Sequence, residues 1–245
     1  MMVLVKEAGE EVDLAAAQEV VKQVLVKPNS VVGLATGNTT VGLHKAVVQL
    51  HRECGVSFSG IVTFNVDEYV NVPVDHPASC RVRIFEQLLD RVDIRKENCH
   101  LPDGNADNLD DAARQYQDLV SAAGGIDLQI LSVGPNGHIG FNEPGTPFER
   151  QAHVVEITSQ SLEVKAEFYR KTGFYPQQAI TLGIRNIMNA RKILFVAKGI
   201  GKSEIVAKAL LGPVTPEVPA SVLQLHPDVL VLLDAPAASR LGALR

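Results

Sequence analysis

The chain has 245 residues, of which 46% are hydrophobic, and a formal charge of −5. This length fits one large domain or two small ones, and the apolar share is sufficient for a sizeable core. The mild charge and the scattered Lys and Arg residues argue against a nucleic-acid-binding surface.

Along the chain, apolar β-branched runs alternate with segments whose apolar residues recur every three or four positions. The runs predict strands and the periodic segments predict helices, one of which would be capped by Asp13 and another opened by Ser79. The predicted strands are residues 3–5, 30–35, 61–66, 127–133, 153–158, 192–197 and 228–234. The predicted helices are residues 14–26, 41–54, 79–92, 108–123, 161–170 and 201–211.

The predicted strands are apolar on both faces and are separated by helices, which is typical of an α/β fold with a mostly parallel sheet and helices on both faces. The chain shows no internal repeat, low-complexity stretch or linker. We therefore predict one α/β domain over residues 1–245.

The remaining sequence features predict the compartment. The apolar run at the N-terminus is interrupted by Lys6 and Glu7, which argues against a signal peptide. No stretch approaches the length of a transmembrane span. Cys54, Cys80 and Cys99 are an odd number without metal-ligand spacing and are typical of reduced thiols. We expect a soluble cytoplasmic protein without membrane or nucleic-acid partners.

Three unusual loops follow predicted strands, and parallel sheets bind ligands at the carboxyl ends of their strands. The first loop is TGNTT, residues 36–40, where Gly37 and small hydroxyl residues precede a helix. Backbone N–H groups at such a helix N-terminus favour an anion, and the absence of the GxxxxGK[ST] pattern favours a monophosphate over a nucleoside triphosphate. Lys202 follows another predicted strand and would end on the same edge. The alternatives are an ordinary turn and a surface lysine.

The second loop holds the adjacent carboxylates Asp67 and Glu68 after an apolar strand. Adjacent side chains at a strand end point in different directions, so at most one of them would enter a cleft. A carboxylate beside apolar walls loses hydration, its pKa rises, and it becomes a better base. The alternative is that Asp67 caps a turn and Glu68 is solvated.

The third loop, GPNGHIGFNEP, combines His138 and Glu143 with three glycines and two prolines that restrict its path. Glu143 could orient the imidazole and stabilise its charged form, and the pair would then shuttle protons to a substrate oxygen. Two alternatives remain open. His138 could be a structural histidine bonded to a backbone carbonyl, or Asp67, His138 and Glu143 could form a metal site. The other histidines show no HxH or HExxH spacing.

Together these residues resemble the glucosamine-6-phosphate deaminase family, also called glucosamine-6-phosphate isomerases. The matching stretches are GLATGNTT, VTFNVDEYV with DHPAS, GPNGHIGFNEPGT, QAITLGI and GPVTPEVPASVLQLHPDVLVLLD. They occur in family order over nearly the whole chain. The resemblance implies a Rossmann-like fold with a helical lid around residues 159–176. It also implies conversion of D-glucosamine 6-phosphate and water to D-fructose 6-phosphate and ammonia, with no cofactor and no metal.

The resemblance also implies roles for individual residues. Asp67 matches the base that removes the C2 proton, His138 the acid/base of ring opening, and Glu143 its carboxylate partner. Asn136 falls within the same ring-opening group, where some members have Asp. The residues that match the phosphate contacts are Thr36, Gly37, Asn38, Thr39 and Lys202.

This sequence departs from the family pattern in two places. Glu167 stands where many members carry a lid arginine that helps to hold the phosphate, so binding would weaken unless Lys165, Arg170 or Lys171 substitutes or Glu167 turns away. The basic residues of the family's allosteric site are not evident after FNEP, so we predict no activation by N-acetylglucosamine 6-phosphate.

Two rival functions stay open on the sequence alone, a 6-phosphogluconolactonase-like hydrolase and a non-catalytic sugar-phosphate sensor. The lactonase would need no base for C–H removal. A sensor of this kind usually carries a helix-turn-helix segment, for which no residues are left over. The family includes monomers and hexamers, so a homo-oligomer is possible.

Overall fold

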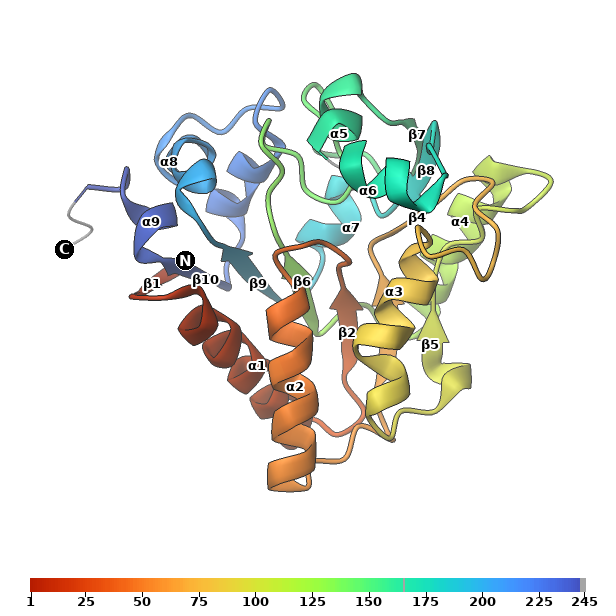
Figure 1. Ribbon diagram of the computed structural model, residues 1–245, viewed down its shortest axis with the longest axis horizontal. Helices are drawn as coiled ribbons and strands as arrows, with labels where there is room; N and C mark the ends of the chain where they lie inside the picture. The colour runs from red at the N-terminus through yellow and green to blue at the C-terminus, as the bar shows by residue number, and fades with distance from the viewer. Residues whose placement is uncertain (165, 243–245) are drawn as a thin grey trace.

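Within the described part of the chain, residues 1–164 and 166–242 of a computed structural model, a seven-stranded sheet forms the centre of the molecule (Figure 1). Every neighbouring pair of its strands is parallel, as the sequence predicts. In pairing order the strands are β1 (Met2–Lys6), β10 (Val229–Asp234), β9 (Lys192–Ala197), β6 (Leu128–Leu131), β2 (Val31–Leu34), β3 (Val62–Asn65) and β5 (Cys99–His100).

Helices cover both faces of this sheet, which confirms the predicted α/β fold. Alternate residues of β9 point to opposite faces, so Leu194 and Val196 join one apolar core while Phe195 and Ala197 join the other. The first core is covered by α1 (Gly9–Val26), α2 (Val41–Cys54) and α3 (Cys80–Gln87). The second is covered by α4 (Leu109–Ala122), α7 (Ile184–Met188), α8 (Ser203–Leu211) and α9 (Ala235–Ala238). Short 3-10 turns occupy Leu89–Arg91, Lys96–Asn98, Ile200–Lys202 and Pro219–Leu225.

A second, antiparallel sheet has the strand order β4 (Asp67–Tyr69), β8 (Gln178–Thr181), β7 (His153–Glu156). The strand predicted over 153–158 is therefore present, but it lies outside the parallel sheet, and the other two strands were not predicted. The helix predicted over 161–170 corresponds to α5 (Ser159–Val164) and α6 (Ala166–Thr172), which lie beside this small sheet in Figure 1.

Two predicted helix boundaries are wrong. The first helix begins at Gly9 with Ala8 as its N-cap, so Asp13 lies inside the helix and does not cap it. Asp13 faces the protein interior instead, where its carboxylate accepts hydrogen bonds of 2.6 and 2.7 Å from Lys198 Nζ. The helix opened by Ser79 ends at Gln87, because Leu88 leaves the helical conformation.

The strand order places a topological switch point beside β2. The chain passes from β2 to β3 on one side of that strand and later returns to β6 on the other side. Crevices at the carboxyl ends of such strands are the usual ligand sites of open parallel sheets. Within the described residues, no helix is both long and apolar enough to cross a membrane.

Candidate active site

A cavity of about 290 Å³ lies at the carboxyl ends of β2 and β6. Seven of the nine predicted site residues line it, and the other two, Asn136 and Glu143, contact its wall from behind. The structure thus brings together segments that are far apart in the sequence. The lining residues are 35–40, Asp67, 131–135, His138, Gly140, Phe141 and Lys202.

The loop over residues 36–40 connects β2 to the N-terminus of α2. Thr40, which the sequence analysis did not single out, holds this loop. Its Oγ1 accepts a bond from the Gly37 N–H at 3.2 Å and lies 3.0 Å from the Ala35 carbonyl oxygen, to which it donates. Thr40 stands at the N-cap position of α2, where threonine is common, but its side chain bonds the loop and makes no capping bond to the helix. Thr36 Oγ1 is buried without a hydrogen-bond partner among the described residues.

Lys202 ends the 3-10 turn that follows β9, and its ammonium group lies at the wall of the cavity. Lys202 Nζ donates to the Val133 carbonyl oxygen at 2.7 Å. Burial lowers the pKa of Lys202. The loop of residues 36–40 and this ammonium group line one cavity, so both can face the same anion.

Asp67 is buried and lines the cavity from the start of β4. Cys80 Sγ lies 3.5 Å from Asp67 Oδ1, and the side-chain amide of Asn65 donates to the Asp67 carbonyl oxygen at 3.0 Å. Of the two adjacent carboxylates, Asp67 is therefore the one that enters the cleft.

Glu68 does not line the cavity and is buried, so the alternative in which Glu68 is solvated is wrong. Its carboxylate accepts bonds of 2.8 to 2.9 Å from Ser79 Oγ and from the N–H groups of Tyr69, Cys80 and Arg81. Glu68 thereby caps the N-terminus of α3. The sequence could not pair Glu68 with Ser79, because the loop between them has no regular periodicity.

His138, Glu143 and Asn136 form one network in the loop after β6. His138 Nδ1 lies 3.4 Å from Glu143 Oε1, and Asn136 Nδ2 donates to Glu143 Oε2 at 2.6 Å. The His138 backbone N–H donates to Asn136 Oδ1 at 3.2 Å, and the loop turns at Gly137 with φ of 95°. The carboxylate therefore faces the imidazole, as the catalytic interpretation requires.

The alternative metal interpretation does not match the geometry. Within residues 1–164 and 166–242, no three His, Cys, Asp or Glu residues are gathered so that they could hold a metal ion. Asp67 and the His138–Glu143 pair share the cavity without forming a common ligand set.

Residues 159–176, the segment predicted as a helical lid, contact the strand that carries Asp67 through aromatic residues. Tyr169 of α6 is buried, and its hydroxyl lies 2.8 Å from that of Tyr69, two residues after Asp67. Burial raises the pKa of Tyr169 to about 12, so the hydroxyl is neutral at physiological pH. Glu167 faces solvent and pairs with Lys171 at 2.7 Å, away from the cavity lining. Lys165, a candidate replacement for the lid arginine, lies outside the described residues.

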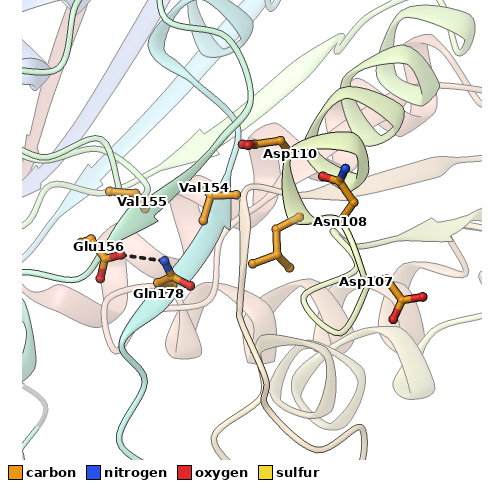
Figure 2. Close-up of a pocket in the computed structure, with 8 residues that line it drawn as sticks. Asp107, Asn108, Asp110, Val154, Val155, Glu156 and Gln178 are labelled. Carbon is orange, nitrogen blue, oxygen red and sulfur yellow. Dashed lines mark hydrogen bonds between the residues drawn. The ribbon is translucent and has the colours of Figure 1, made fainter.

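A second hollow, of about 500 Å³, lies between the start of α4 and strands β7 and β8 (Figure 2). Three carboxylates line it, those of Asp107, Asp110 and Glu156, and no lining residue is a cation. Glu156 accepts a 2.6 Å bond from Gln178. This negative lining would repel a sugar phosphate, whereas the cavity beside β2 holds seven of the predicted site residues and is the candidate site.

Comparisons with known proteins point to one family. The family model of glucosamine-6-phosphate isomerases and 6-phosphogluconolactonases matches residues 4–231. A glucosamine-6-phosphate deaminase of Thermoanaerobacter pseudethanolicus is 42% identical over 98% of this chain and 94% of its own length. The glucosamine-6-phosphate deaminase of Clostridioides difficile is 42% identical over 99% of this chain and 97% of its own length.

Solved structures show the same similarity. A monomeric glucosamine-6-phosphate deaminase superposes with a TM-score of 0.95 at 38% identity, covering 98% of this chain and 100% of that protein. The 6-phosphogluconolactonase of Trypanosoma brucei superposes with a TM-score of 0.79 at 20% identity, over 98% of each chain. The second likeness concerns the fold alone.

Proposed function

The chain belongs to the family of glucosamine-6-phosphate isomerases and 6-phosphogluconolactonases, and on this premise we propose that it is a glucosamine-6-phosphate deaminase. It would convert D-glucosamine 6-phosphate and water to D-fructose 6-phosphate and ammonia. One observation carries this proposal, namely that Asp67 and the His138–Glu143 pair converge with Lys202 on a single cavity. The deaminase relatives are about twice as identical to this chain as the lactonase structure is. This difference favours deamination over lactone hydrolysis.

The phosphate group of the substrate would bind at the N-terminus of α2. Residues 37–39, Thr36 with its buried hydroxyl, and Lys202 all line this end of the cavity, and Thr40 Oγ1 holds the Gly37 N–H. Oriented N–H groups and the helix dipole favour a negative charge there. Anchoring the phosphate fixes the position of the sugar relative to the two acid–base groups.

Ring opening would come first, because a pyranose has no acidic C–H bond until its aldehyde forms. With Nδ1 facing Glu143, His138 can use Nε2 to move a proton between O1 and O5 of the sugar. Glu143 orients the ring and stabilises the imidazolium form, while Asn136 fixes the carboxylate.

Asp67 would then act as the base of the isomerisation. Its carboxylate removes the C2 proton, which the new carbonyl group has made acidic, and an enolamine forms. Protonation at C1 gives an iminium group at C2, and water hydrolyses this group to the ketone with release of ammonia. General acid–base help of this kind contributes about 10²–10⁴-fold per group.

The decisive assay supplies the purified protein with D-glucosamine 6-phosphate and measures ammonia and fructose 6-phosphate together. The two products are expected in equal amounts. A lactonase would instead hydrolyse 6-phosphogluconolactone and release no ammonia, and a sensor would bind the sugar phosphate without turnover. Either of these outcomes contradicts the proposal.

Replacement of the base tests the mechanism. Asp67→Asn removes the proton acceptor but keeps the shape of the side chain, so kcat is expected to fall about 10²–10⁴-fold. Affinity for fructose 6-phosphate, measured by calorimetry, should stay within about threefold, since the phosphate contacts remain. Asp75→Asn, at an exposed loop position, is the matched control and should retain wild-type turnover.

A further inference from the structure

The phosphate end of the cavity has little positive charge for a dianionic ligand. Among the residues that line the cavity, Lys202 is the one with an ammonium or guanidinium group, and burial lowers its pKa. A phosphate monoester carries a charge of about −1.5 to −2 at neutral pH. Glu167, where the resemblance implies an arginine, is a carboxylate directed to solvent. A further cation near the loop of residues 36–40 would complete the charge balance.

Arg83 is the candidate for such a cation; it belongs to α3 and stands outside the residues that line the cavity, next to α6. Its guanidinium carbon is 5.2 Å from the ring centroid of Phe168 on α6. Burial lowers the pKa of His44, in the first turn of α2, and the Arg83 charge lowers it further, so Arg83 lies near both elements. Figure 1 shows α2 and α3 side by side, with α6 next to the upper end of α3.

A hydrogen bond sets the register of the two helices. His44 Nδ1 lies 3.0 Å from Gln87 Oε1, so the first turn of α2 is level with the last turn of α3. Arg83 is one turn closer than Gln87 to the N-terminus of α3. Both helices start at the carboxyl-end edge of the parallel sheet, α2 after β2 and α3 beside Glu68, so they run in the same direction. Arg83 is therefore level with the start of α2, where the loop of residues 36–40 ends.

The guanidinium of Arg83 has no carboxylate partner within residues 1–164 and 166–242, although the residue is half-buried. A partly desolvated charge is costly unless an opposite charge compensates it. A planar guanidinium also matches two phosphate oxygens at once. We propose that Arg83 is a phosphate-binding residue, which contacts the 6-phosphate of the substrate from the α3 side of the loop of residues 36–40. This inference rests on the proposed function.

The test compares Arg83→Gln with a matched control, Arg81→Gln, which removes an exposed guanidinium from the same helix. Losing a charge-assisted contact is expected to raise KM for glucosamine 6-phosphate about 10- to 100-fold and to leave kcat within about threefold. The affinity for inorganic phosphate, measured by calorimetry, should fall in Arg83→Gln and stay unchanged in Arg81→Gln. Unphosphorylated glucosamine provides a second control, because its kcat/KM should not respond to either change.

Several outcomes would overturn the inference. One is wild-type affinity of Arg83→Gln for both inorganic phosphate and fructose 6-phosphate. Another is an equal loss of kcat/KM for glucosamine with and without its phosphate, which would indicate a structural role. If Arg83→Gln does not fold, Arg83→Met replaces it, because methionine keeps the apolar stem over Phe168. The affinities of Arg83→Met for inorganic phosphate and fructose 6-phosphate then test the inference. If the wild-type protein binds fructose 6-phosphate but releases no ammonia, the proposed function is wrong. The role of Arg83 in phosphate binding is then still tested by the affinities for inorganic phosphate and fructose 6-phosphate.

Discussion

Gly134 lies directly beneath the imidazole of His138. A Cβ atom at this position would come within 2.1 to 2.5 Å of three ring atoms, so the ring would have to move. Gly134→Ala is therefore expected to displace His138 from Glu143 and to lower kcat about 10²-fold, the usual effect of misplacing a catalytic group by about 1 Å. Steady-state kinetics on glucosamine 6-phosphate measure this loss.

Gly201→Ala is the matched control for this substitution. It adds the same methyl group at a position with open space and an ordinary backbone conformation, so turnover should stay at the wild-type level. Equal turnover in Gly134→Ala and wild type would show that the ring position is not critical to the reaction.

His44 is fully buried, and its environment predicts a pH-dependent stability. Burial lowers the pKa of His44 from 6.5 to about 4, with a further lowering from Arg83 and an opposing effect of the Gln87 hydrogen bond. The unfolded chain thus binds a proton near pH 6.5 while the folded chain does not, so stability falls as the pH drops through this range. The loss reaches roughly 3 kcal/mol near pH 4.

Urea unfolding at several pH values measures this contribution. His100 and His153 also have pKa values lowered by burial, so the informative quantity is the difference between wild type and His44→Gln. The variant should lose less stability between pH 6.5 and 4 than the wild type does. Identical pH dependence of the two proteins would contradict the assignment.

The residues that carry the proposed chemistry could be predicted from the sequence because their types are unusual for loops that follow buried strands. Asp67, His138 and Lys202 were found in this way, and all three line the cavity. Thr40 was not predicted as a site residue, and the burial of Glu68 was not predicted. Both side chains bond to backbone groups whose positions are defined only in the folded loops.

At the scale of elements, α3 depends on a carboxylate from a neighbouring strand. Glu68 accepts four hydrogen bonds at the N-terminus of this helix of eight residues. In Glu68→Gln, one oxygen becomes an NH₂ group that cannot accept the two bonds made by the oxygen it replaces. Unfolding free energy is expected to fall by about 2–4 kcal/mol, as measured by urea denaturation.

Glu86→Gln makes the same chemical change on the exposed face of α3 and should alter stability by less than about 0.5 kcal/mol. Similar losses in the two variants would show that the helix N-terminus does not rely on Glu68.

The long helices followed from apolar periodicity, and the strands of the parallel sheet mostly followed from apolar runs. Strands β2, β3 and β6 are as short as β8, but they lie within the longer apolar runs over residues 30–35, 61–66 and 127–133. Strands β4 and β8 lie in no such run. They pair with each other across more than a hundred residues of sequence, so their partners are set by tertiary contacts. The start of α1 was misjudged because Asp13 resembles an N-cap, while its real partner is Lys198 of a distant strand end.

At the scale of the whole molecule, the order of the strands assembles the site. Residues 35–40 and 131–135 lie on both sides of the switch point between β2 and β6, and β4 adds Asp67 from the small antiparallel sheet. The parallel sheet could be predicted from strands that are apolar on both faces. The second sheet, which carries the proposed base, could not.

The composition of the segment after FNEP argues against activation by a phosphorylated effector that binds there. Allosteric activation requires a second binding site that favours one of two states. In the segment after FNEP, residues 144–158, Arg150 is the one Lys or Arg residue. His153 is buried there, and burial lowers its pKa, so it is uncharged at neutral pH. One exposed cation is a weak site for a phosphate dianion.

We therefore expect hyperbolic saturation by glucosamine 6-phosphate, with a KM that N-acetylglucosamine 6-phosphate does not lower. Initial rates over a range of substrate concentrations, with and without the effector, test this. Competition of the effector for the catalytic cavity would raise KM and leave the curve hyperbolic, so it is distinguishable from activation. A sigmoidal curve that the effector converts to a hyperbola would show that the chain has a second phosphate site, formed by residues outside 144–158 or by another subunit.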